Sequence, residues 1–274
     1  MAKRRNRLKI HLPPFFRLSK RQKFVLATLI LTFGLVATQG IDSQWRYGAV
    51  CFLAFLAFVL SVFSLREDIN GIEWVVLFIL PIFFTAAVAL FYFLLPLRLL
   101  TRFPVAVFFA IGFYALLLTV NIYNIAAIRT IALLRAARTI GFLITVITAF
   151  LLFDTIFTLH LPSIIQGLFA FIISISLLFQ ALWSIILSDR VEERLLFFSI
   201  GMALLIGEVA FFMAFWPVTA LMGALFLTSI FYVLLGMGQR YFDQRLFRKE
   251  VYEFIIIGTS MFFLLFFSTK WGAR

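Results

Sequence analysis

The sequence has few of the residues that metal sites and disulfides require. Cys51 is its single cysteine, so no intramolecular disulfide can form, and His11 and His160 are its only histidines. It has no H-E-x-x-H or C-x-x-C motif and no phosphate-binding loop of the type G-x-x-x-x-G-K-S/T. We therefore expect no metal centre, no haem, no other cofactor and no nucleotide-driven motor.

Charged residues are also scarce, and this scarcity sets the fold class. They make up 13% of the 274 residues, whereas 64% are hydrophobic. A soluble domain has about twice this share of charge. The solvent that suits such a composition is lipid, so we predict an all-α fold, a polytopic integral membrane helix bundle.

The apolar residues gather in runs long enough to cross a bilayer, which takes about 20 residues. We predict nine transmembrane helices: Phe24–Ile41, Tyr47–Leu65, Trp74–Leu95, Val105–Ala126, Ile140–Leu159, Ser163–Leu187, Leu195–Trp216, Val218–Met237 and Phe254–Thr269. The last run is short, and it reaches full length only if it begins near Val251. Eight spans with a re-entrant tail are the alternative.

Basic residues set the expected orientation. The net charge is +12, but Lys and Arg fall between the apolar runs. This distribution indicates that they orient the spans in the membrane and argues against nucleic acid as a partner. With the N-terminus inside, the inner segments hold 19 Lys and Arg and the outer segments hold 5. We expect a basic cytoplasmic tail at 1–23, a transmembrane domain at 24–269 and a short outside tail at 270–274. The tail at 1–23 would also meet anionic lipid headgroups.

Two further patterns concern packing and the membrane surface. Ala203, Gly207, Ala210 and Ala214 lie on one line of the seventh span, where small residues let helix backbones approach closely. We expect their partner patch on the eighth span, at Ala220 and Ala224. The segment Gln239–Glu253 separates basic from aromatic residues imperfectly, and we interpret it as an interfacial helix.

Several polar residues lie inside the runs. Gln166, Ser176, Gln180 and Ser184 form a stripe on the sixth span, and Asn121 and Asn124 lie on the fourth. A glutamine pair facing lipid is unfavourable, so these faces should look inward. They either hydrogen-bond between helices or line a polar cavity.

Asp154 and Glu208 are the two acids well inside predicted spans, and both fall in the outer half of the membrane. A carboxylate there must be paired, wetted or protonated. One interpretation makes them cation or proton sites. The other pairs them with Arg98 or Arg102, in the outer turn between the third and fourth spans.

The stretches Asn121–Arg138 and Phe150–Ile156 resemble a family of bacterial polytopic membrane proteins of unknown function. The resemblance implies no activity, but it favours a bacterial inner (cytoplasmic) membrane.

Two hypotheses of function follow from the polar residues. The first is a transporter-like protein with a polar cavity among helices four to seven. The alternative is a non-catalytic scaffold or assembly subunit with membrane protein partners. A membrane-embedded lipid enzyme comes third, because two carboxylates alone are thin support for chemistry.

Overall fold

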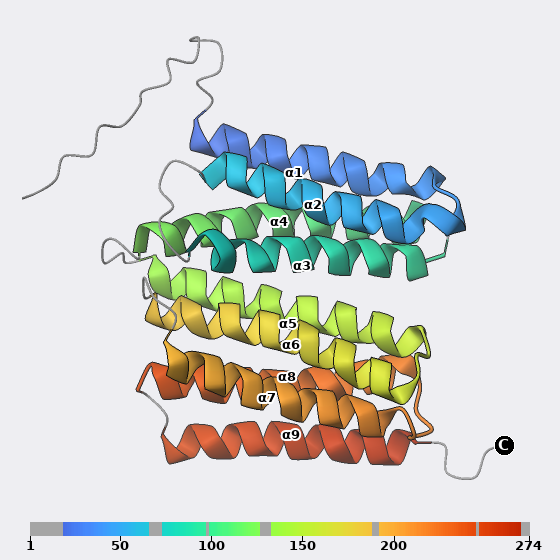
Figure 1. Cartoon of the computed structure of the whole chain (residues 1–274), viewed down its shortest axis with the longest axis vertical. Coiled ribbons are helices and arrows are strands. Elements are labelled where there is room, and N and C mark those ends of the chain that lie inside the picture. Colours follow the sequence, from blue (N-terminus) through green and yellow to red (C-terminus); the bar gives the residue numbers. More distant parts are fainter. Residues whose placement is uncertain are drawn as a thin grey trace, which may run out of the picture.

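The described part of the chain forms nine α-helices and no β-strand, which confirms the predicted fold class (Figure 1). The structure is a computed structural model that describes residues 19–65, 73–96, 99–126, 133–187, 192–244 and 247–269. Its helices are α1 (Lys20–Ala37), α2 (Arg46–Leu65), α3 (Glu73–Leu94), α4 (Leu99–Ala126), α5 (Leu134–Thr158), α6 (Ser163–Ile186), α7 (Glu193–Met213), α8 (Ala220–Phe242) and α9 (Arg248–Ser268). Two short 3-10 turns, Thr38–Gly40 and Ser43–Trp45, connect α1 to α2.

The apolar runs become helices because hydrocarbon offers no partner to the backbone N–H and C=O groups, which a helix satisfies internally. Local polar residues fix where two of the helices begin. Ser19 and Gln22 form a capping box at the start of α1, each side chain bonding the other residue's backbone N–H. The Thr219 hydroxyl accepts from the backbone N–H of Met222 at the start of α8.

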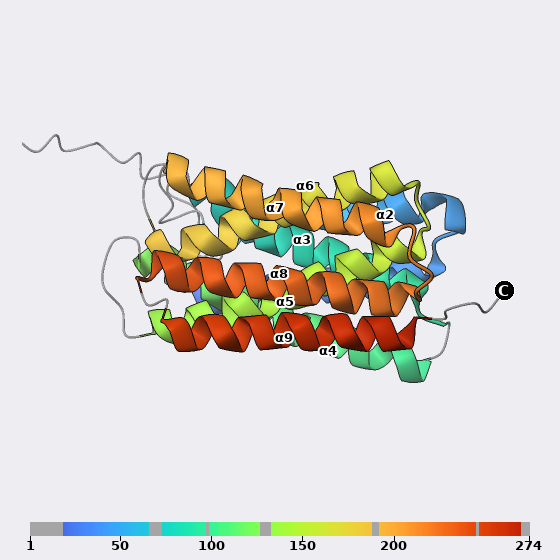
Figure 2. The ribbon, with the colours of Figure 1, turned by 90° about the horizontal axis from the view of Figure 1, so that it is seen from below.

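The helices lie side by side and alternate in direction, with α5 at the centre (Figure 1). Helix α5 packs against α3, α4, α6 and α8. Helix α7 packs mainly against α6, and α9 packs against α8, so both lie at the edge of the bundle (Figure 2). Edge helices have a large surface for lipid or for partners.

Eight of the described helices, α2 to α9, are long and apolar enough to cross a membrane. The chain is therefore a multi-pass membrane protein. Helix α1 has only 18 residues, and Lys20, Arg21 and Lys23 occupy its first turn. Its apolar remainder packs along α2 and α4, parallel to the crossing helices (Figure 1).

The interfacial helix expected at Gln239–Glu253 is wrong. Residues as far as Phe242 complete α8, and α9 begins at Arg248, so the segment is divided between two spans. Gln244, between them, has a positive φ of 56°, which turns the chain out of the helical path. The last span is consequently longer than the predicted Phe254–Thr269, and it is one continuous helix of 21 residues.

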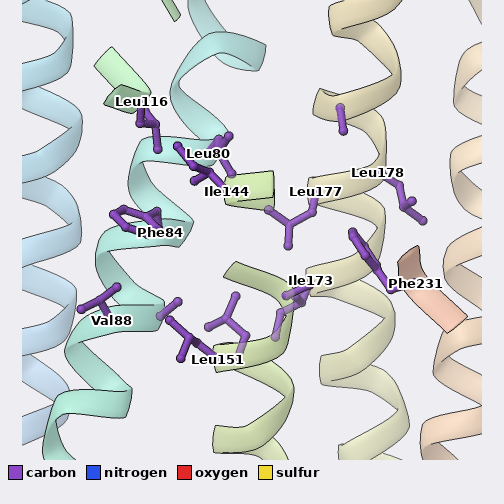
Figure 3. Packing of buried hydrophobic residues seen from close by; sticks show 14 of the residues in the cluster. Leu80, Phe84, Val88, Leu116, Ile144, Leu151, Ile173, Leu177, Leu178 and Phe231 are labelled. Carbon is purple, nitrogen blue, oxygen red and sulfur yellow. The ribbon is translucent and has the colours of Figure 1, made fainter. Parts of the chain in front are cut away.

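Large side chains from the central helices interdigitate in the core (Figure 3). Phe84 of α3 stacks on Phe109 of α4, with ring centres 5.7 Å apart. Phe153 of α5 meets Phe231 of α8 edge to face at 6.1 Å. Lipid tails are as apolar as these side chains, so the gain comes from close van der Waals packing instead of escape from water.

Helices α6 and α7 make the closest backbone approach. Cβ atoms built on Gly167 and Gly207 would lie 2.9 and 3.0 Å from the carbonyl oxygen of the other glycine. Ala203 and Ala210 are also fully buried, so the small-residue stripe is a packing face as predicted. Its partner is α6, however, and the expected match with α8 is wrong. Ala214 is exposed and takes no part.

Substituting Gly207 tests this contact. In Gly207→Leu the new side chain meets a backbone carbonyl, which cannot rotate away, so we expect a loss of about 2 kcal/mol or more in unfolding free energy. The measurement is the melting temperature in detergent. Gly48→Leu is the control, since a Cβ on Gly48 meets no heavy atom within 4 Å. Equal melting temperatures for the two variants would contradict the packing face.

Candidate functional site

One of the four polar residues predicted on α6 hydrogen-bonds to another helix. The Gln166 side chain is buried, and its Nε2 donates to the Ala210 carbonyl of α7 at 2.8 Å. Gln180 is buried as well, but its Oε1 accepts no hydrogen bond from the described residues. Ser176 and Ser184 donate to carbonyls of their own helix. Gln166, Gln180 and Ser184 are therefore buried, Ser176 is half-buried, and Gln166 bridges two helices.

On α4, Asn124 is fully buried and Asn121 is half-buried. The Oδ1 atom of Asn121 accepts no hydrogen bond from the described residues. Neither asparagine lines the cavity described below.

The structure does not bring the two intramembrane acids together. Asp154 is buried on α5, whereas Glu208 is exposed on α7, on the side away from α6. Neither makes a hydrogen bond or ion pair with a described residue.

The ion-pair interpretation does not hold for Arg102. Its Nη2 donates to the Leu95 carbonyl at 3.4 Å, and its guanidinium lies 5.2 Å from the centre of the Tyr92 ring. Arg98, the other expected partner, lies outside the described residues.

A cavity of about 850 Å³ opens elsewhere, between the start of α5, the end of α8 and the start of α9. These ends lie on the side of the bundle where α1 begins (Figure 1). The lining residues are Leu134, Arg135, Arg138, Thr139, Phe142, Ile185, Tyr232, Gly236, Gln239, Arg240, Asp243 and Phe254. None of the eight intramembrane polar residues singled out by the sequence is among them.

The mouth of this cavity is cationic. Three arginines and one aspartate line it, which gives a formal charge of +2. Arg138 Nη1 lies 3.4 Å from Asp243 Oδ1, and Arg240 Nη1 lies 3.2 Å from Glu250 Oε1. Arg135 is exposed and makes no ion pair with a described residue, so its charge is available to a ligand.

Arg138 ties the cavity to the rest of the bundle. Its Nη2 donates to the Ile185 carbonyl of α6 at 2.7 Å, and its buried Nε has no acceptor among the described residues. A buried donor without a partner costs free energy.

The deeper wall is aromatic. Phe142 of α5 meets the Tyr232 ring of α8 at 5.4 Å, and Tyr232 meets Phe254 of α9 at 5.9 Å. Gly236 makes room for Phe254, since a Cβ there would lie 2.5 Å from that ring. Tyr232 lies eight residues before Arg240, about 12 Å deeper along α8. The cavity thus combines a cationic mouth with an apolar interior.

The sequence did not reveal this site, because its arginines were counted only to predict the orientation of the spans. Arg135, Arg138 and Arg240 are 105 residues apart at the extremes, and only the packing of α5 on α8 brings them together. One signal was present in the sequence. Arg138 lies one turn before Phe142 on α5, and Tyr232 lies about two turns before Arg240 on α8, and this order suits an amphiphile.

The fold and the site define an all-helical protein of the membrane whose cavity lies at one end of its bundle. The chain belongs to the family described as "Protein of unknown function (DUF5656)", whose sequence profile matches residues 30–268. Neither a curated protein nor a solved structure matches the chain.

The variants Asp154→Asn and Arg102→Gln separate the ion-pair and unpaired interpretations of Asp154. Because the carboxyl has no partner among the described residues, Asp154→Asn should leave the melting temperature in detergent unchanged or higher. Arg102→Gln loses its contacts with Leu95 and Tyr92 and should lower it. In the double variant, the changes in unfolding free energy of the two single variants should add. A loss of about 3–5 kcal/mol for Asp154→Asn, the usual cost of breaking a buried pair, would contradict this picture.

Proposed function

We propose that the protein binds an anionic amphiphile, a lipid with a phosphate headgroup, in the cavity between α5, α8 and α9. The observation that carries the proposal is the order of the lining, with Arg135, Arg138 and Arg240 at the mouth and Phe142 and Tyr232 below them. A lipid has the same order, with its charged group at the membrane surface and its chains in the hydrocarbon. The volume of about 850 Å³ lies within the range of small-molecule sites.

Arginine chemistry favours phosphate as the recognised group. A guanidinium offers donors in a planar fork that fits two phosphate oxygens at once. Asp243 and Glu250 hold two of the three guanidinium groups in place, while the exposed Arg135 retains its donors for a ligand. Each basic residue near an anionic surface contributes about 1 kcal/mol of attraction.

The aromatic wall would contribute shape more than affinity. An acyl chain that moves from the bilayer onto Phe142 and Tyr232 leaves one apolar medium for another, so it gains little from the hydrophobic effect. Discrimination among lipids should therefore rest on the headgroup.

Transport through helices four to seven, the first hypothesis from the sequence, has weaker support. Glu208 is exposed on the far side of α7, so it cannot share a cavity with Asp154 in the described arrangement. The outer part of α5 is also tightly packed, with the Phe157 ring against Gly223 of α8. The scaffold alternative is favoured by the bond from Gln166 to Ala210, which is a structural link between helices.

We further propose that the cavity opens toward the cytoplasm. The support is the distribution of Lys and Arg, 19 in the inner segments against 5 in the outer ones when the N-terminus is inside. The setting is then the cytoplasmic membrane, with the lipid drawn from its inner leaflet. The basic tail expected to meet anionic headgroups falls largely on residues 1–18, which lie outside the described residues.

Thermal shift in detergent tests the binding. Short-chain phosphatidic acid should raise the melting temperature more than the matching phosphatidylcholine does. A ligand present at 100 times its dissociation constant stabilises the folded protein by about 2.7 kcal/mol. Arg135→Gln combined with Arg240→Gln should abolish the difference. Inorganic phosphate alone should have little effect, because it lacks the chains that place the headgroup.

Arg46→Gln is the control for a general effect of charge. Arg46 lies at the start of α2, at the opposite end of the bundle, with its guanidinium 5.7 Å from the centre of the Phe93 ring. This variant should keep the full response to phosphatidic acid. Equal responses to both lipids in the wild-type protein would refute the proposal. A full response to inorganic phosphate would overturn it as well, because the site would then bind a free anion and not a lipid.

A further inference from the structure

The outward side of α7 carries a carboxyl group on an otherwise apolar surface. Glu208 lies five residues before the end of α7, about 8 Å inside the outer end of the helix. It is exposed, and it makes no hydrogen bond or ion pair with a described residue. Hydrocarbon disfavours a carboxylate, and even a neutral carboxyl retains a donor and an acceptor that need partners.

The exposed residues around Glu208 form a regular seam. Steps of three or four residues connect them along one line of the helix, the spacing with which two helices pack together. The seam consists of Phe197, Gly201, Leu204, Glu208 and Phe212 on α7 and of Phe215 in the turn that follows, all of them exposed. A Cβ on Gly201 would meet no heavy atom within 4 Å, so this position leaves room for a second helix.

We infer that this seam is the contact between two copies of the chain. A two-fold axis along the membrane normal places each residue of α7 at the same depth as its counterpart, so the two Glu208 side chains meet. A carboxyl both donates and accepts, so two of them complement each other without any further group. They can share one proton or form a doubly hydrogen-bonded pair.

Among the described residues, Arg102 offers Glu208 no better partner. Arg102 also lies near the outer end of the bundle, but it is buried against Tyr92 and is not presented to the lipid-facing surface. Across the seam, the group at the depth of Glu208 is therefore Glu208 itself. Packing α7 on α7 would bury a helix that now has only one extensive neighbour, α6.

Cysteine cross-linking in native membranes tests the inference. Because Cys51 is the only cysteine, a Cys51→Ser chain gives a clean background. Leu204→Cys, in the middle of the seam, should give a band at twice the monomer mass after oxidation. Ile111→Cys, at an exposed position near the middle of α4, is the matched control and should give much less of this band.

Two substitutions of Glu208 show whether the carboxyl is responsible. Glu208→Gln should keep the cross-link, because an amide also donates and accepts. Glu208→Leu should weaken self-association about fivefold or more, the effect of losing one interhelical hydrogen bond in lipid. Its melting temperature should not fall, since the side chain is exposed in the monomer.

Three results would overturn the inference. The first is cross-linking of Leu204→Cys no stronger than that of Ile111→Cys. The second is full self-association of Glu208→Leu. The third is a cross-linked product whose mass shows a different protein as the partner of α7.

Discussion

Hydrocarbon cannot hydrogen-bond, and this constraint decides where each polar group of the chain lies. Most hydroxyl groups satisfy this constraint by hydrogen-bonding inside their own helix. Thr85, Thr145 and Thr148 each donate to the carbonyl four residues earlier, at 2.7 to 2.9 Å. Longer side chains reach across helices instead, as Gln166 does to α7, and Tyr123 donates to the Ala137 carbonyl of α5 at 3.0 Å. Polar residues therefore hold the bundle together where small residues bring its backbones close.

Two of the charged groups that the bundle leaves without a described partner underlie the proposals. At one end this is Arg135, beside a cavity wide enough for a headgroup. Near the other end it is Glu208, on the surface that faces lipid. One site calls for an anion and the other for a hydrogen-bonding group within the membrane. The two sites lie on different helices, so a ligand and a second copy could be bound together.

The sequence predicted the fold well because the length of an apolar run is a local property. It also identified the buried side of α7, since Gly207 and Ala210 share a helical line. It did not identify α6 as their partner, because several spans carry small residues and only three-dimensional packing chooses among them. The amphipathic pattern at Gln239–Glu253 was misleading for a related reason: a turn at Gln244 divides it between two helices.

The candidate site was harder to predict than the fold. Sequence reasoning chose the residues that are unusual within a span, such as Asp154 and Gln180. The cavity instead uses arginines at helix ends, which every membrane protein has for topology. Their grouping depends on α5 lying beside α8, a contact between segments about 100 residues apart. Nothing local in the sequence records that contact.

We propose that the cavity opens to the cytoplasm and binds an anionic lipid, and one labelling experiment tests both points directly. Thr139 lines the cavity, so Thr139→Cys in a Cys51→Ser chain places a single thiol there. An impermeant maleimide should not label it in intact cells but should label it in inverted membrane vesicles. Short-chain phosphatidic acid should slow the labelling in those vesicles, and phosphatidylcholine should not. Labelling from outside intact cells, or equal rates with both lipids, would contradict the claim.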